Sequence, residues 1–430
     1  RGTNRGMRLA PLALLTLLAF PVAAQAATPI PQNQADLAGL DTFSGKVPKP
    51  HRVEAPRVPR HPFMAANGRN AVHNDAYQTD TYRTGGPLGG EEMSVFSQSI
   101  DGAGGLGSCG ITIAFDKRGR LITTCISATS VTLRLMDKRL NTIANHPLPP
   151  RVIPPGVNPL QAPGGAYFYL DNKDRAVVSI ARRIHVVAVR GDSLRRVREY
   201  NLESVVPEDD QINSALPDWS GRLWFVTRRH GIVGVLDPKS GRVLGTRRTN
   251  EAVGNSFAMD ETGGVFIVTD KAQYRFDATR RGKPKLSWRF RYDNSGVKKP
   301  GQFDEGSGTT PTLMGKQYLS IADNADHMQV VVLRRAKRLA RGQRRLVCEQ
   351  PVFRRGASAT ENSIIATGRS MIVENNYGYF PPPDAPTQPG VERVDIRRDG
   401  NGCRTVRKSS ETSPSTVPKL SLASGLIVNA

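Results

Sequence analysis

Residues 213–227 have the sequence NSALPDWSGRLWFVT, and residues 255–269 have the sequence NSFAMDETGGVFIVT. Both stretches begin with Asn-Ser, carry Asp and Gly at the same offsets, and end in an apolar run followed by Thr. Repetition of this kind is the sequence signature of repeat architectures, and it outweighs any local pattern. The agreement predicts that the chain is built from copies of one structural unit.

Further copies flank these two stretches. An Asp-x-x-Gly tetrad occupies residues 116–119, a variant spans 171–174, and Asn362-Ser363 begins another copy. Together with weaker copies, the units begin near residues 111, 166, 213, 255, 310, 362 and 417, with a period of about 42 to 55 residues.

Each unit contains short apolar runs separated by turn sequences. In Asp-x-x-Gly the Asp can hydrogen-bond to the backbone that follows, and the Gly can take a positive φ, which closes a tight hairpin. Four antiparallel strands at this period are typical of a β-propeller blade. We predict an all-β propeller of seven or eight blades over residues 93–430, in which Met93 to Ile100 completes the last blade. A pair of β-sandwiches is the rival architecture, but it would not require matched repeats.

The third and fourth units resemble the pyrroloquinoline-quinone-like (PQQ-like) and YVTN repeats of secreted bacterial propellers. The stretch Val235 to Leu244 is similar to their strand-turn-strand segment, and Tyr274 to Asp277 with Lys285 to Arg289 is similar to a longer version. The resemblance implies the fold but not an activity, because one fold hosts many functions. Three tryptophans and no adjacent cysteine pair argue against a quinone-dependent dehydrogenase, which stays the least favoured alternative.

The N-terminal residues have the three parts of a signal peptide. Arg8 precedes an apolar run from Leu9 to Val22, and Ala24-Gln25-Ala26 is a cleavage site, so we predict a signal peptide over residues 1–26. The run is too short for a membrane span, so the mature protein is not expected to be transmembrane. Residues 27–92 are rich in Pro and Gly and indicate an extended leader. The apolar C-terminal residues suggest a truncated propeller.

The predicted export indicates that the cysteines form disulfides and that the partners lie outside the cytoplasm. Four cysteines suit an oxidising compartment, and none has metal or redox spacing. Cys109 and Cys125 flank one predicted hairpin, which leaves Cys348 and Cys403 as the second pair. The formal charge of +22 is compatible with anionic envelope polymers or lipid head groups as partners, but a solvated basic surface is the favoured explanation. Nucleic acid is not expected, since the protein is secreted or periplasmic by the general secretory route.

Candidate ligands of a metal ion occur where the innermost strands begin. The repeat places Asn213, Asn255, Glu361 and Asn362 there, and oxygen ligands that converge from several blades suit calcium. This pattern resembles lactonase and esterase propellers of the paraoxonase and gluconolactonase kind, in which an axial calcium polarises the ester carbonyl. The simpler interpretation is that the Asn side chains tie the inner strands together through backbone hydrogen bonds.

No catalytic motif accompanies the repeat. The histidines have no metal spacing, and neither H-E-x-x-H nor G-x-S-x-G occurs. Polar clusters at residues 323–326 and 374–376 follow apolar strands and indicate loops on one face. A dense basic run covers residues 334–345. The sequence therefore favours an exported propeller that acts as a binding or scaffold module in the cell envelope or outside the cell, with a protein or small ligand as its partner. A calcium-dependent lactonase or esterase is the alternative.

Overall fold

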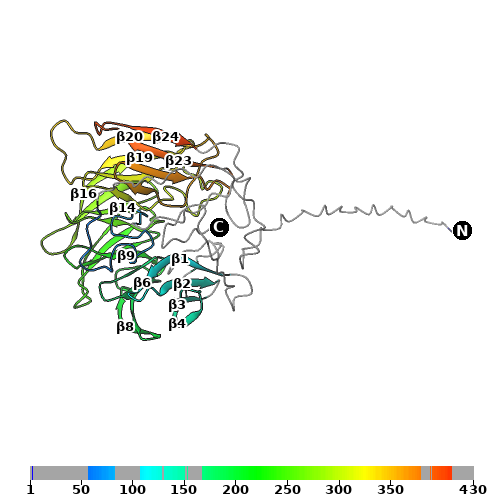
Figure 1. Ribbon diagram of the computed structural model, residues 1–430, viewed down its shortest axis with the longest axis vertical. Coiled ribbons are helices and arrows are strands. Elements are labelled where there is room, and N and C mark those ends of the chain that lie inside the picture. Colours follow the sequence, from blue (N-terminus) through cyan, green and yellow to red (C-terminus); the bar gives the residue numbers. More distant parts are fainter. Residues whose placement is uncertain are drawn as a thin grey trace, which may run out of the picture.

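The chain is an all-β protein in the computed structural model, which describes residues 57–82, 107–127, 130–150, 167–378 and 390–408, with isolated residues at 2, 153 and 388. These residues form six four-stranded antiparallel sheets and no helix. Each sheet contains four strands that are consecutive in sequence. Figure 1 shows the sheets arranged in an arc that runs from β1 to β24. The fold is a β-propeller, and each sheet is one blade.

The first three blades follow one another in chain order. Their strands are β1 Gly107–Phe115, β2 Leu121–Ser127, β3 Val131–Met136 and β4 Thr142–Leu148; β5 Phe168–Leu170, β6 Arg175–Ile180, β7 Arg183–Arg190 and β8 Ser193–Asn201; β9 Ile212–Pro217, β10 Leu223–Thr227, β11 Ile232–Leu236 and β12 Val243–Arg248.

The next three blades repeat the pattern. Their strands are β13 Ala258–Met259, β14 Val265–Val268, β15 Ala272–Ala278 and β16 Pro284–Arg291; β17 Thr312–Met314, β18 Tyr318–Ala322, β19 Gln329–Arg334 and β20 Leu346–Pro351; β21 Ile365–Thr367, β22 Ser370–Glu374, β23 Val391–Ile396 and β24 Cys403–Lys408. The predicted start near 417 and the predicted strand from Met93 to Ile100 lie outside the described residues.

The Asp-x-x-Gly tetrads form the hairpin between the first two strands of a blade. In the third blade Asp218 Oδ1 accepts hydrogen bonds from the backbone N–H groups of Ser220 and Arg222, at 2.9 and 3.0 Å. Its Oδ2 accepts from Arg222 Nε at 2.7 Å. Gly221 has a φ of 82°. Asp116, Asp171 and Asp260 make the same backbone contacts in their blades, which is the turn chemistry that the repeat predicted.

Apolar cores lie between successive blades. One cluster joins the first and second blades, one spans the second to the fourth, one joins the fourth and fifth, and one joins the fifth and sixth. No such cluster of described residues joins the sixth blade to the first. A blade buries both of its faces only against neighbouring blades. Six blades are described, so the prediction of seven or eight blades is not tested by these residues.

Residues 57–82, the central segment, bond to the first strands of five blades. Backbone hydrogen bonds link the segment to Phe115 in β1, Leu170 in β5, Met259 in β13, Leu313 in β17 and Ala366 in β21. These strands therefore surround the segment and line the central channel. The sequence placed these residues in an extended leader, and they do lack regular structure, but they are packed against the first strands of the blades. The segment contacts one blade after another, so its buried residues do not follow the spacing of a helix or a strand. The sequence of the segment therefore gives no periodic signal of its burial.

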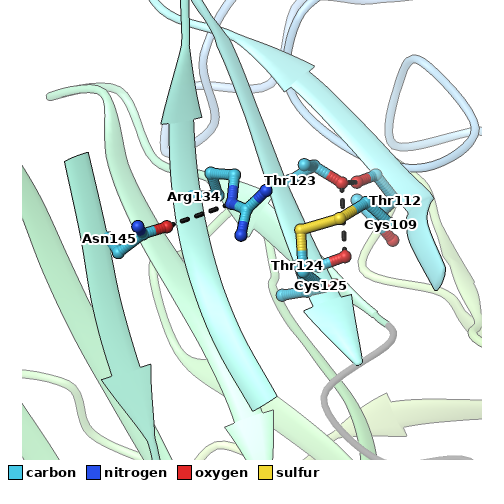
Figure 2. Close-up of a disulfide and its surroundings, with 7 residues drawn as sticks. All are labelled: Cys109, Thr112, Thr123, Thr124, Cys125, Arg134 and Asn145. Carbon is cyan, nitrogen blue, oxygen red and sulfur yellow. Dashed lines mark hydrogen bonds between the residues drawn. A yellow bond between two sulfur atoms is a disulfide. The ribbon is translucent and has the colours of Figure 1, made fainter. Parts of the chain in front are cut away.

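Two disulfides join strands, as the cysteine count predicted. Cys109 pairs with Cys125 across β1 and β2, next to Thr123, whose hydroxyl donates to the carbonyl of Thr112 (Figure 2). Cys348 in β20 pairs with Cys403 in β24 and so connects the fifth blade to the sixth. The described residues include no helix long and apolar enough to cross a membrane. The predicted signal peptide lies outside them.

Candidate binding site at the mouth of the channel

Polar loops gather at one end of the channel because the strands of each blade are antiparallel. The start of a first strand and the end of the second strand lie at the same edge of the sheet. Residues 209–211 precede β9, residues 228–229 follow β10, residues 269–270 follow β14, and residues 304–307 lie ahead of β17. These loops surround one pocket.

This mouth pocket has a volume of about 210 Å³ and is strongly acidic. Its charged lining consists of two guanidinium groups and five carboxyl groups, namely Arg228, Arg229, Asp209, Asp210, Asp270, Asp304 and Glu305. The whole chain carries a formal charge of +22. The local charge of the pocket is therefore opposite to that of the chain.

Hydrogen bonds fix several of these carboxylates. Asp210 is buried, and its Oδ1 accepts from the backbone N–H groups of Gln211 and Arg229, both at 2.8 Å. Both oxygens of Asp304 lie 2.5 Å from Arg228 Nη2. Burial raises the pKa of Asp270, which accepts a backbone hydrogen bond from Ala252 at 3.0 Å. Asp210, Asp270 and Asp304 are therefore held in place by hydrogen bonds.

A second cluster of ionisable groups lies near Asp304. Burial raises the pKa of Glu361 well above its ordinary value, and the carboxylate of Asp304 adds to the shift. Burial also raises the pKa of Tyr167, which is close enough to feel the charges of Glu361 and Arg228. Glu361 Oε1 is buried and has no hydrogen-bond partner among the described residues.

The asparagines at the predicted metal positions tie neighbouring blades together. Asn213 Nδ2 donates to the backbone carbonyls of Val253 and Asn255, at 3.1 and 3.0 Å. Asn255 Nδ2 donates to the carbonyl of Ser307 at 2.8 Å. The backbone N–H of Asn362 donates to Thr360 Oγ1 at 3.3 Å. The structure brings Asn213 and Asn255 together, and it places Glu361 with Tyr167 and Asp304.

The polar clusters after β18 and β22 also make structural contacts. Burial raises the pKa of Asp323 to about 7, and its Oδ1 accepts from the backbone N–H groups of Ala325 and Gln329. Asn375 Oδ1 accepts from the backbone of Ala359 at 3.1 Å. These clusters stand out in the sequence because they follow the second strand of a blade. Arg228 and Asp270 hold the same position in the third and fourth blades and line the pocket. Inspection of this position in every blade would have identified both residues from the sequence.

The basic run divides between interior and surface. Arg335 is fully buried, donates to Asp260 Oδ2 and Tyr77 Oη, each at 2.9 Å, and joins the fifth blade to the fourth and to the central segment. Arg345 stacks on Trp288 at 4.4 Å. The exposed members are Lys337, Arg338, Arg341 and Arg344.

No family model matches the chain. An uncharacterized protein of Archaeoglobus fulgidus is 27% identical over 304 residues, which is 61% of this chain and 58% of the relative. The chain therefore spans less than two thirds of that relative, and its resemblance to PQQ-like and YVTN repeats stays a prediction.

Several solved structures are similar in part. A periplasmic gluconolactonase of Pseudomonas aeruginosa has a TM-score of 0.43 at 14% identity, covering 70% of this chain and 86% of its own. Virginiamycin B lyase of Staphylococcus aureus has a TM-score of 0.37 at 11% identity, covering 71% and 85%. BamB of Moraxella catarrhalis has a TM-score of 0.33 at 13% identity, covering 54% and 61%. At these TM-scores the similarities carry no inference about activity.

Proposed function

We propose that this protein is an exported β-propeller that binds a small ligand with a cationic group in the mouth pocket. The observation that carries the proposal is a pocket with five carboxyl groups on a chain of strongly positive charge. Charge complementarity of this kind selects ligands and repels those of like sign. Two disulfides support an oxidising, extracytoplasmic location.

The pocket is suited to a guanidinium or ammonium group. Asp270 is held by a backbone hydrogen bond, and Glu305 is exposed at the rim. Arg228 pairs with Asp304 and Arg229 pairs with Asp209. Asp210 accepts its hydrogen bonds from the backbone, so Asp270 and Glu305 remain to meet the positive charge of the ligand. Binding should weaken as pH falls, since the raised pKa of Asp270 makes it take up a proton earlier than an ordinary aspartate.

Calorimetric titration with N-methylguanidinium tests the proposal, and neutral N-methylurea of similar shape is the control ligand. The double variant Asp270→Asn/Glu305→Gln should weaken binding at least tenfold. Glu208→Gln, an exposed carboxylate outside the pocket lining, should leave it unchanged. Equal binding of both ligands, or an equal loss in the control variant, would reject the mouth pocket.

The alternative is a calcium-dependent lactonase or esterase with an axial ion held by Asn213, Asn255, Glu361 and Asn362. The unpartnered Glu361 Oε1 suits a cation. The amide nitrogens of Asn213 and Asn255 donate to backbone carbonyls, and the side-chain oxygens of these residues are the atoms that calcium could take. No three His, Cys, Asp or Glu side chains of the described residues form a metal-binding group. A bound calcium would supply a Lewis acid for an ester carbonyl.

Thermal melts with calcium and then with chelator separate the two functions. A bound ion raises the melting temperature by mass action, so an unchanged midpoint would eliminate calcium. A shift that Glu361→Gln abolishes would support the ion instead. An absorbance scan tests the quinone-dependent dehydrogenase.

A further inference from the structure

Three side chains that are remote in sequence lie in the order of a nucleophilic relay inside the channel. Ser363 Oγ is 3.2 Å from His73 Nε2, and His73 Nδ1 is 2.9 Å from Asp80 Oδ2. His73 and Asp80 belong to the central segment, and Ser363 lies two residues ahead of β21. Burial by the surrounding blades brings them together.

The hydrogen bonds define the role of each atom. The carboxylate of Asp80 can only accept, so His73 Nδ1 carries the proton and Nε2 has its lone pair free for a hydroxyl. Ser363 Oγ accepts a hydrogen bond from the backbone N–H of Thr310 at 2.9 Å. The hydroxyl hydrogen of Ser363 is thus left to point at His73. This is the arrangement in which an imidazole activates a serine.

Thr310 is the competing hydroxyl, since its Oγ1 is 3.1 Å from the same nitrogen. Its side chain is buried, with 1% of the residue exposed, whereas Ser363 is partly exposed. Ser363 is also a less hindered primary alcohol. Ser363 is therefore the more accessible of the two hydroxyl groups.

The relay lies close to the mouth pocket along the chain. Ser307 lines the pocket, and Thr310 follows it by three residues. The backbone of Asp80 has a φ of 53°, in the left-handed region that Asp enters more readily than most residues other than glycine.

We propose that Ser363 is the nucleophile, His73 the general base and Asp80 the positioning residue of a site that hydrolyses small carboxylic esters. Ser363 Oγ attacks the carbonyl carbon while His73 Nε2 takes the hydroxyl proton. The tetrahedral intermediate then expels the alcohol, which receives that proton from His73. Water, deprotonated by His73, attacks the acyl-serine, and the carboxylic acid leaves as Ser363 regains its proton. This activity does not depend on whether the mouth pocket binds a cation.

Labelling of the full chain with a small fluorophosphonate tests the nucleophile. The reagent should attach to Ser363, as mapped by mass spectrometry of the peptides, and the protein should hydrolyse p-nitrophenyl acetate. Ser363→Ala should reduce both rates at least 100-fold. The matched control is Ser256→Ala, because Ser256 occupies the same repeat position but hydrogen-bonds to Ser214 instead of a histidine. Thr310→Val should also retain labelling.

Asp80→Asn tests positioning, since it keeps the size of the side chain but favours the wrong tautomer of His73. It should lower the labelling rate at least tenfold and alter its pH profile, and Asp80→Glu should restore part of the rate. Melting curves show whether each variant is folded, and direct mapping on the unmodified protein needs no variant. An unlabelled protein, a label on another serine, or an equal loss in Ser256→Ala would overturn the proposal.

Discussion

Asp75 illustrates at the scale of one residue how burial between the blades changes the pKa values of the central segment. Its side chain is buried, its Oδ1 accepts from the backbone of Tyr77 at 2.9 Å, and its Oδ2 accepts from Thr79 Oγ1 at 2.6 Å. Burial raises its pKa to about 7, and the nearby Asp80 adds to the shift. His61 in the same segment shows the opposite effect, because burial lowers its pKa to about 4.

The raised pKa predicts a pH dependence of stability that Asp75→Asn should remove. The folded state holds a proton on Asp75 that the unfolded state releases above its ordinary pKa of 3.8. The stabilisation is therefore complete below that pKa and is lost as pH rises to about 7, by at most about 1.4 kcal/mol per pH unit.

Urea denaturation of the wild type and Asp75→Asn at pH 5 and pH 7 measures this effect. The stability of the wild type must be subtracted from that of Asp75→Asn at each pH. His61 is present in both proteins and favours the folded state as pH rises over much of the same range, so its effect cancels in the difference. The stability of the variant should increase relative to that of the wild type as pH rises. Asp192→Asn, at an exposed carboxylate, is the control. A constant difference between wild type and Asp75→Asn would contradict a buried, protonated Asp75.

At the scale of the element, the hairpin turns have a local role and a tertiary one. Gly221 and Gly263 hold the same position in successive blades, with φ values of 82° and 84°. A Cβ on Gly221 would lie 2.7 Å from Phe63 Cζ, whereas a Cβ on Gly263 would meet no atom within 4 Å. Of these two glycines, only Gly221 lies where an added Cβ would contact the central segment.

This pair separates backbone strain from docking of the segment. Gly263→Ala should cost about 1 kcal/mol, the strain of placing a side chain at positive φ. Gly221→Ala should cost more, because Phe63 must also move. Denaturation midpoints compare the two variants. Equal losses would show that the Phe63 ring moves away from the new Cβ at no measurable cost in stability.

At the scale of the whole molecule, the two disulfides constrain different parts of the propeller. Cys109 and Cys125 are 16 residues apart within one blade, and Cys348 and Cys403 are 55 residues apart and connect two blades. Loop-closure entropy grows with the length of the closed loop, so the second bridge should stabilise the fold by about 1 kcal/mol more than the first.

The comparison uses two double serine variants, one for each bridge, in urea denaturation. The Cys348→Ser/Cys403→Ser protein should unfold at the lower urea concentration. If the Cys109→Ser/Cys125→Ser protein unfolded at the lower urea concentration, the length of the closed loop would not explain how much each bridge stabilises the fold.

The exposed basic loop predicts binding to anionic surfaces. Replacing Lys337, Arg338, Arg341 and Arg344 by Gln should weaken sedimentation with phosphatidylglycerol vesicles at low salt, because each basic group near such a surface contributes about 1 kcal/mol. The control removes the same number of exposed basic groups from the third blade, at Lys239, Arg242, Arg247 and Arg248. A similar loss in both proteins would indicate a response to net charge and not to this loop.

The sequence by itself determined the repeat, the four-stranded antiparallel blade, the chemistry of its turns and both disulfides. The blades, their turns and the first disulfide depend on residues close in sequence or on a pattern that recurs, as Asp218 and Gly221 recur at Asp260 and Gly263. The second disulfide followed by elimination, because only Cys348 and Cys403 were left. Only the tertiary structure decided where residues 57–82 lie, that Arg335 is buried, and that His73 and Asp80 meet Ser363. Contacts between segments hundreds of residues apart have no local pattern, because the packing of the central segment against the first strands of several blades creates them.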